Sequence, residues 1–116
     1  MHELGLTESI LKTALDEAAR AGATAVRGLH LVLSSASHIE PETVRQHFAV
    51  ISRGTPAEGA ELSFTIREVV ETCRICGRTF VVHHDEGCPH CGTPALAVDQ
   101  EDELRLESLD LDVPAA

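Results

Sequence analysis

Residues 73–91 read CRICGRTFVVHHDEGCPHC and hold the four cysteines of this 116-residue chain, as two C-x-x-C pairs eleven residues apart. Each pair, Cys73 with Cys76 and Cys88 with Cys91, can close a tight turn in which two thiolates face one ion. Two such turns form the four-sulfur tetrahedron that zinc prefers. A redox C-x-x-C motif normally occurs once, at the start of a helix, and a disulfide is rare in a reducing compartment. The spacing therefore predicts a closed, structural zinc site.

The segment around the cysteines has few apolar residues from which to build a core of its own. Binding zinc would offset the entropy that is lost when this segment becomes ordered. Gly77 and Gly92 each follow a cysteine pair and supply backbone freedom where a turn ends. His83, His84 and His90 lie in the same segment, and we expect them to be exposed loop residues rather than ligands.

Hydrophobic periodicity outside this segment predicts helices that alternate with strands. In chain order we expect a helix over 4–19, a strand over 26–33, a helix with Pro41 near its start that ends at 53, a strand over 61–70 and a last strand over 102–113. In the first strand, His30 faces away from the leucines on either side of it. In the last strand the apolar phase slips between Leu106 and Leu109, which predicts a β-bulge.

The predicted fold class is α/β. We expect a small three-stranded mixed sheet with two helices packed on it, plus a zinc-ribbon-like insert that carries the two C-x-x-C knuckles. Residues 1–70 and 97–116 should form the α/β domain, and residues 71–96 the zinc-binding insert. The core should consist of large apolar residues from both helices and all three strands: Leu6, Ile10, Leu15, Leu31, Leu33, Val44, Phe48, Ile51, Leu62, Phe64, Ile66 and Leu106.

The composition limits the kind of partner that the chain can bind. The formal net charge is −10, from 9 basic and 19 acidic residues, and the chain has three Phe but no Trp or Tyr. Because nucleic-acid binding needs a basic face or stacking aromatic rings, we expect no nucleic-acid partner. No stretch approaches the about 20 apolar residues that span a bilayer, and no signal peptide precedes the first helix. We therefore expect a cytoplasmic protein without membrane attachment.

The chain starts with MHE, and these residues can form a metal chelate. The terminal amine, the peptide nitrogen of His2 and the His2 imidazole can all reach one ion, and such nitrogen-rich, nearly planar sites suit Ni(II) and Cu(II). Glu3 can add its backbone nitrogen or its carboxylate. The alternative interpretation is that a single histidine near a mobile chain end has no metal-binding role.

Several motifs occur together in one order: MHE at the start, IEPE at 39–42, GTPAEGAEL at 54–62, the two cysteine pairs, and ELRLESLDL at 103–111. In this pattern the chain resembles the HypA/HybF family, the nickel-incorporation proteins of NiFe hydrogenase maturation. The resemblance covers nearly the whole chain. It implies a nickel metallochaperone that accepts Ni(II) and helps to load the hydrogenase large-subunit precursor, together with a HypB-type GTPase accessory protein.

The resemblance also implies ligands for both metals. The family's nickel site is built around the MHE terminus, which corresponds here to Met1, His2 and Glu3. An acidic residue in the turn before the second helix has been linked to that site, and Glu40 is the matching position. The structural Zn(II) would be held by the four cysteines named above.

One turn departs from the family pattern. Many members carry a Gly-Glu-Leu-Ser turn after the first strand, whereas this chain has SSAS at 34–37, so Ser35 replaces the glutamate. Any partner or nickel contact that members make through this glutamate does not carry over. His38 adds an imidazole nearby that could compensate, although we expect it to be an exposed turn residue.

Two other classes of function fit the sequence less well. A zinc-ribbon interaction adaptor without a nickel role would present basic or aromatic residues from its hairpins, and residues 77–87 offer only Arg78, Phe80 and two histidines. An enzyme would need a nucleophile beside the HHDE stretch at 83–86, and none accompanies it. We therefore predict that the chain is not an enzyme. For its oligomeric state we expect a monomer or a weak homodimer.

Overall fold

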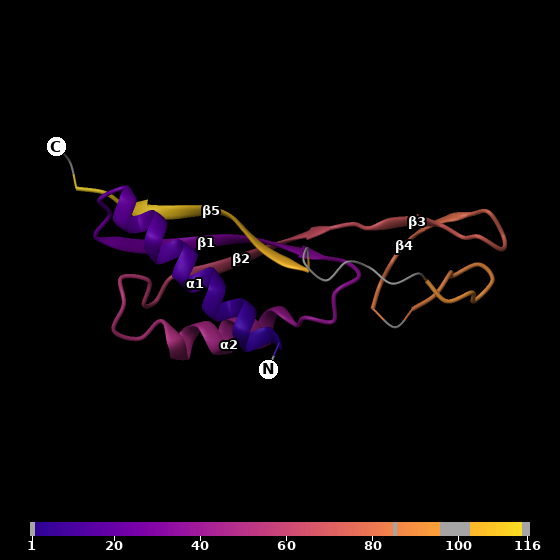
Figure 1. The fold of residues 1–116 in the computed structure, drawn as a ribbon, viewed down its shortest axis with the longest axis horizontal. Coiled ribbons are helices and arrows are strands. Elements are labelled where there is room, and N and C mark those ends of the chain that lie inside the picture. The colour runs from indigo at the N-terminus through magenta and orange to yellow at the C-terminus, as the bar shows by residue number, and fades with distance from the viewer. Residues whose placement is uncertain (1, 85, 96–102, 115–116) are drawn as a thin grey trace.

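The computed structural model describes residues 2–84, 86–95 and 103–114, with only the backbone of His2 and Glu3. In these ranges the elements follow in the order α1 (His2–Arg20), β1 (Ala25–Ser34), α2 (Pro41–Ile51), β2 (Glu61–Arg67), β3 (Val70–Thr72), β4 (Thr79–Val81) and β5 (Leu104–Asp112). The molecule is elongated, 59 × 29 × 18 Å. The helices and long strands form one lobe, and β3, β4 and the cysteines form another (Figure 1).

β1 is the central strand of a three-stranded sheet with the order β2-β1-β5. It pairs in parallel with β2, where Leu31 lies opposite Phe64, and antiparallel with β5. Because a parallel neighbour can be reached only by a crossover connection, α2 serves as the link from β1 to β2. The predicted α/β class and mixed sheet are confirmed, and the structure adds the strand order.

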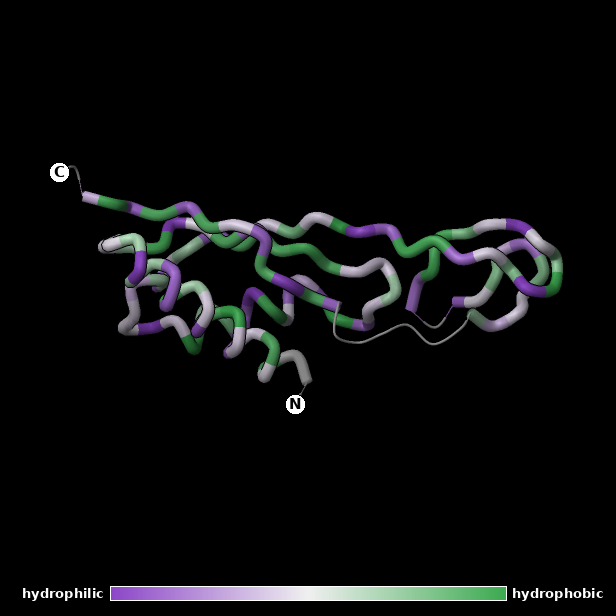
Figure 2. The backbone as a smooth tube through the Cα atoms, turned by 45° about the horizontal axis from the view of Figure 1, so that its top comes forward, coloured by the Kyte–Doolittle hydropathy of each residue, from purple (hydrophilic) through white to green (hydrophobic). Residues whose placement is uncertain are grey.

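Both helices pack on one face of this sheet and contact each other (Figure 1). Leu29, Leu31 and Leu33 of β1 point into that face and are buried. Polar and apolar residues alternate along the long strands, as expected when only one face of a sheet is covered (Figure 2). The buried core consists of Ile10, Leu11, Ala14, Ala18, Val26, Leu29, Leu31, Leu33, Ile39, Val44, Phe48, Ala57 and Leu104.

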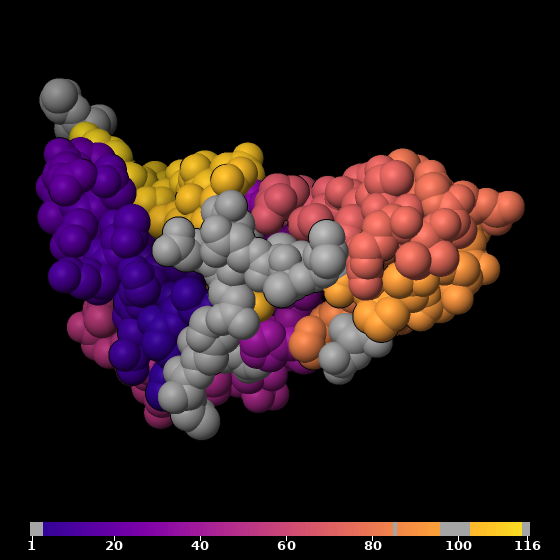
Figure 3. Space-filling view, turned by 45° about the vertical axis from the view of Figure 1, so that its right-hand side comes forward, coloured from indigo at the N-terminus to yellow at the C-terminus, as the bar shows by residue number. Residues whose placement is uncertain are grey.

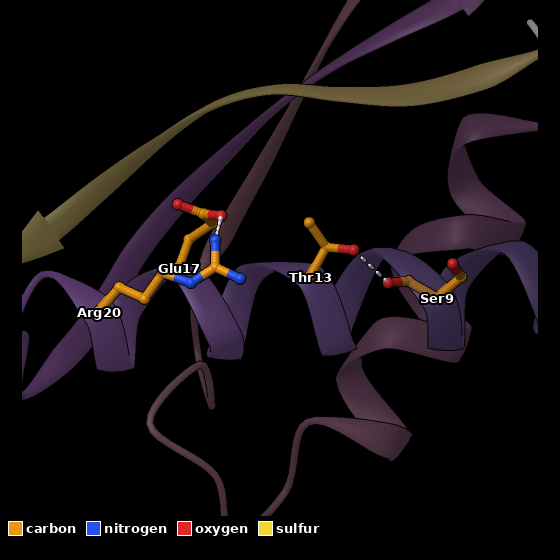
Figure 4. Close-up of polar contacts among 4 residues, drawn as sticks. All are labelled: Ser9, Thr13, Glu17 and Arg20. Atoms are coloured by element: carbon orange, nitrogen blue, oxygen red, sulfur yellow. Dashed lines mark hydrogen bonds and ion pairs between the residues drawn. The ribbon is translucent and has the colours of Figure 1, made fainter.

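The exposed side of α1 carries two side-chain contacts within the helix (Figure 4). Arg20 donates a hydrogen bond of 2.6 Å to Glu17, and the Thr13 hydroxyl donates one of 3.0 Å to the carbonyl of Ser9. Gly22 follows the helix with a φ of 69°, a left-handed conformation that glycine adopts without strain. None of the described helices is long and apolar enough to cross a membrane.

Most of the predicted core is confirmed, because its members are either buried or packed against the buried cluster. Ile66 is the exception: its exposed fraction is 52%, so its assignment to the core was wrong. Ile66 lies one residue before the end of β2, on the edge strand, which has a neighbour on one side only. The end of an edge strand is covered less completely than the strands inside a sheet.

The single strand predicted over 61–70 was also wrong. β2 ends at Arg67, and β3 begins at Val70 in a separate two-stranded sheet, where it pairs with β4. Between them the N–H of Val69 donates to the hydroxyl of Ser35 at 2.9 Å, and its carbonyl accepts from the N–H of Val82 at 2.7 Å. The chain thus changes partners at Val69, from the first sheet to the second.

The predicted β-bulge in the last strand is confirmed. His30 lies opposite Ser108, while the next residue, Leu31, lies opposite Leu106. Glu107 is therefore left without an opposite residue in β1. This extra residue explains why the apolar phase of β5 slips at this point.

The face of the sheet that the helices leave open carries a polar network across all three strands. Nδ1 of His30 lies 2.7 Å from the hydroxyl of Ser63, and Nε2 lies 2.9 Å from a carboxylate oxygen of Asp110. A Cβ added to Gly28 would lie 2.8 Å from that same oxygen. Glycine at position 28 thus leaves room for the carboxylate to reach the imidazole.

The second lobe has a small hydrophobic cluster of its own, separate from the core of the first. Its buried members are Cys73, Phe80, Val82 and Cys88, and Ala36, Val69 and Ala95 pack against them. Ala36 belongs to the turn after β1, so this turn contributes directly to the second lobe. The space-filling view shows the second lobe projecting from the first (Figure 3).

Candidate metal centre

Each cysteine pair forms a turn that is closed by backbone hydrogen bonds. In the first turn the N–H of Gly77 donates to the carbonyl of Cys73 at 2.9 Å, and in the second the N–H of Gly92 donates to that of Cys88 at 2.8 Å. The two glycines have φ values of 78° and 80°. Because side chains disfavour this left-handed conformation, glycine after each pair allows the turn to close. The two turns are therefore built alike.

The two turns bring all four sulfurs together. The Sγ atoms of Cys73, Cys76, Cys88 and Cys91 lie within 4.8 Å of one another, and in the described part of the chain no other group of three or more His, Cys, Asp or Glu does so. Cys73 Sγ lies 3.6 Å from Cys91 Sγ, and Cys76 Sγ lies 3.7 Å from Cys88 Sγ. A disulfide needs about 2.05 Å, so the sulfurs are not bonded to each other. Sulfurs about 2.3 Å from a tetrahedral ion are about 3.8 Å apart, which these distances fit.

Two of the sulfurs are held in surroundings that favour the thiolate. The pKa of Cys73 is lowered to about 6, mainly because the backbone N–H groups of Cys76 and Ile75 point at its sulfur. The pKa of Cys91 is also lowered, first by the Thr93 hydroxyl, which lies 3.1 Å from its sulfur, and then by the backbone N–H of Thr93. These two cysteines are thus prepared to bind a cation.

Cys76 behaves in the opposite way. The backbone N–H of Arg78 lowers its pKa, but loss of hydration and the three neighbouring sulfurs outweigh this and raise the pKa to about 11. Four thiolates this close together repel one another, so without an ion the cluster keeps part of its protons. A divalent cation removes that repulsion and takes the place of the protons. The cluster is thus a metal-binding site.

The histidines of the second lobe lie outside this cluster. His83, His84 and His90 are exposed, as predicted. His90 lies beside Arg78, with Nδ1 at 3.2 Å from the guanidinium nitrogen. His84 stacks obliquely with His38 from the turn after β1, at 5.2 Å between ring centroids. No sequence pattern pairs these two residues, which are 46 positions apart.

Three of the predicted nickel ligands, His2, Glu3 and Glu40, lie at the starts of the two helices. Met1 is outside the described residues, and His2 and Glu3 begin α1. Glu40 immediately precedes α2, and its side chain is exposed and makes no capping hydrogen bond to the helix. The first turn of α1 lies beside the start of α2 (Figure 1).

The SSAS turn forms its own set of hydrogen bonds. The Ser34 hydroxyl accepts from the N–H of Ala36 at 3.2 Å, and the Ser37 hydroxyl accepts from the N–H of Ile39 at 3.0 Å. Ser35 differs from both, since its hydroxyl accepts from Val69, 34 residues away. Ser35 thus joins the turn to the connection between the two sheets.

Comparison with known proteins identifies the family. A family model described as hydrogenase/urease nickel incorporation, metallochaperone, hypA matches residues 1–111. The hydrogenase maturation factor HypA of Acidithiobacillus ferrooxidans is 34% identical, over 97% of this chain and all of that protein. The hydrogenase maturation factor HybF of Salmonella typhimurium is 33% identical over the same shares.

The fold has solved counterparts as well. The solution structure of the Ni metallochaperone HypA from Helicobacter pylori matches with a TM-score of 0.65 and 16% identity, and the match covers 97% of this chain and 98% of that one. At this identity the match shows the shared fold alone. The model match over nearly the whole chain and the identity to relatives of the same length show more. This chain belongs to the HypA family of nickel-incorporation metallochaperones, which act in hydrogenase maturation.

Proposed function

We propose that the chain binds Ni(II) at its N-terminus and helps to insert it into the large-subunit precursor of NiFe hydrogenase, together with a HypB-type GTPase. The ligands would be the terminal amine of Met1, the imidazole of His2 and groups of Glu3. Glu40 would add a carboxylate from the start of α2. Family membership makes the chain a metallochaperone and confirms that it is not an enzyme.

The observation that carries the proposal is the meeting of the two helix starts. The first turn of α1 lies beside the start of α2 (Figure 1). Glu40 immediately precedes α2 and has an exposed side chain that does not cap its own helix. A carboxylate that is not used as a cap is available to an ion held by the neighbouring chain end. Such an open site allows the ion to exchange, and a chaperone must release its metal.

We propose that the four-cysteine cluster holds zinc rather than nickel. The sulfur separations fit a tetrahedron, which zinc takes with four thiolates, whereas Ni(II) favours planar, nitrogen-rich ligand sets. Zinc has no redox chemistry and would act structurally here. Residues 71–96 would then form a zinc-binding insert, and 1–70 with 97–116 a nickel-binding α/β domain. The separate hydrophobic clusters of the two lobes support this division.

The proposed site is tested by titrating zinc-loaded protein that starts at Met1 with Ni(II), followed by calorimetry and absorption. Two variants remove the terminal chelate: His2→Ala, and a form that carries Gly-Ser-Gly-Ser before Met1, which moves the terminal amine away from the His2 imidazole. We expect each to lose one Ni(II) site while its zinc content stays the same. Unchanged nickel binding in both would refute the N-terminal site, and the chain would then be better described as a zinc-stabilised interaction adaptor.

The contribution of Glu40 needs a matched control. Glu40→Gln removes the proposed ligand charge, whereas Glu42→Gln removes an exposed carboxylate in the first turn of the same helix, where it pairs with Arg45. We expect weaker nickel binding in Glu40→Gln than in Glu42→Gln. Equal affinities would remove Glu40 from the ligand set and leave the terminal chelate untouched.

The partner proteins are tested by reconstitution. Nickel-loaded protein, the GTPase and the hydrogenase precursor should give nickel transfer that depends on GTP, measured by the nickel content of the re-isolated precursor. The His2→Ala variant serves as the control that retains zinc. Equal transfer by this variant would show that nickel delivery does not pass through the N-terminus.

A further inference from the structure

Where the two lobes join, one side chain that can ligate a metal, His38, lies beside two others. His38 comes from the turn after β1, His84 from the insert, and Glu103 immediately precedes β5. Nδ1 of His38 lies 3.5 Å from Oε1 of Glu103, and the His38 and His84 rings lie 5.2 Å apart between centroids, tilted by 44°. In the space-filling view the turn and the insert meet at the surface (Figure 3).

Among the acidic residues whose side chains the structure describes, Glu103 alone is buried, with a side-chain exposure of 8%. A carboxylate is rarely buried unless a cation or several hydrogen bonds compensate it. Its backbone is fixed as well, since its carbonyl accepts from the N–H of Ser34 at 2.9 Å. The backbone of Glu103 is thus held in place, its carboxylate lies next to the His38 imidazole, and the His84 ring lies beside that of His38.

We infer that His38, His84 and Glu103 form a second metal site, which takes a divalent ion of borderline softness such as Co(II), Ni(II) or Zn(II). Two imidazoles with a carboxylate are a ligand set that such ions accept, with the remaining positions open. Imidazoles that share a tetrahedral ion at about 2.0–2.1 Å have ring centroids about 5 Å apart, close to the separation seen here.

The site would close around the ion rather than receive it preformed. Only the four cysteines, among the residues the structure describes, already have all ligand atoms within 4.8 Å. Rotation of an exposed imidazole is therefore part of binding. This cost makes the site weaker than the cysteine cluster, with faster exchange. An ion bound there would also tie the turn before α2 to the insert, because the two histidines belong to different lobes.

The inference does not depend on the N-terminal nickel site. It is tested on the full chain, loaded with zinc and carrying Gly-Ser-Gly-Ser before Met1, so that the terminal amine and the His2 imidazole cannot chelate one ion. This protein is titrated with Co(II), whose visible spectrum reports nitrogen and oxygen ligands. We expect one further equivalent to bind, with a loss of affinity of at least about 10–100-fold in His38→Ala and in His84→Ala.

His83→Ala is the matched control, because His83 is the exposed neighbour of His84. It should bind cobalt like the parent protein. Glu103→Gln keeps the shape and removes the charge, and should also weaken binding. Equal affinity in the parent, His38→Ala and His84→Ala would overturn the inference, as would an equal loss in His83→Ala.

A second measurement does not rely on substitution. In the unsubstituted extended protein, bound Co(II) should shift and broaden the ring NMR signals of His38 and His84, and leave His30 on the open face of the sheet unaffected. Shifts at other histidines, with none at His38 and His84, would place the ion elsewhere. Zinc content and far-UV circular dichroism of each variant distinguish a lost site from a lost fold.

Discussion

The hydrogen bond from Val69 to Ser35 is the contact whose removal best tests how the two lobes are joined. Ser35→Ala deletes the hydroxyl and leaves the half-buried N–H of Val69 without this acceptor, which lies at 2.9 Å. Losing such a bond costs about 1 kcal/mol, since water can reach part of the site. A change of this size shifts an opening equilibrium by about fivefold.

Amide hydrogen exchange of the zinc-loaded protein, followed by NMR, measures this directly. We expect the amides of Val69 and Val82 to exchange about fivefold faster in Ser35→Ala, because Val82 donates to the carbonyl of Val69. Amides of β1 beside Leu29 should not change. The effect is therefore confined to the connection between the sheets.

Ser37→Ala is the matched control. It removes a hydroxyl of the same size from the same turn, but one that accepts from Ile39, two residues away. Exchange at Val69 and Val82 should stay as in the parent protein. Unchanged exchange in Ser35→Ala, or the same acceleration in both variants, would show that Ser35 does not hold the lobes together.

Three further predictions concern the metal cluster and the sheet. Zinc affinity should fall as the pH is lowered, because protons compete with the ion for the thiolates: already at neutral pH for Cys76, whose pKa is raised to about 11, and in addition for Cys73 below about pH 6. An affinity that stays constant between about pH 8 and about pH 5 in a chelator competition would contradict this. Gly77→Ala should weaken zinc binding about 5–30-fold in a chelator competition, since alanine at a φ of 78° costs about 1–2 kcal/mol. Gly28→Ala should displace the Asp110 carboxylate from His30, because the added Cβ would lie too close to it. Since the His30–Asp110 pair is exposed, the free energy of unfolding, measured in urea, should fall by less than about 1 kcal/mol. A larger loss would mean that this network stabilises the sheet more than a surface pair does.

The order of elements and the cysteine cluster could be predicted because each depends on local pattern. Leucines at 29, 31 and 33 alternate as a strand with one covered face does, and the spacing of two C-x-x-C pairs predicts a four-sulfur cluster whatever surrounds it. The bulge at Glu107 was predictable for the same reason, since an extra residue shifts the apolar phase of its own strand.

What could not be predicted depends on contacts between distant segments. Residues 61–70 alternate in a way that is typical of one strand, and only the bonds of Val69 to Ser35 and Val82 divide it in two. Ile66 has a core pattern, but its exposure follows from strand order, which the periodicity of a single strand does not contain. The approach of His38 to His84 has the same origin, since the fold alone brings the turn and the insert together.

The turn at 34–40 is the segment that joins the two lobes and leads into α2. Ser35 holds the connection between the sheets through Val69, and the next residue, Ala36, packs into the hydrophobic cluster of the insert. The same turn ends at Glu40, where α2 begins. The hydroxyl oxygen of Ser35 is bonded directly to its Cβ, so it can accept from the N–H of Val69 only when the turn lies close to the connection between the sheets. The longer side chain of a glutamate would reach further. Serine at position 35 therefore requires a short distance between the turn and the start of the insert, and the structure provides it.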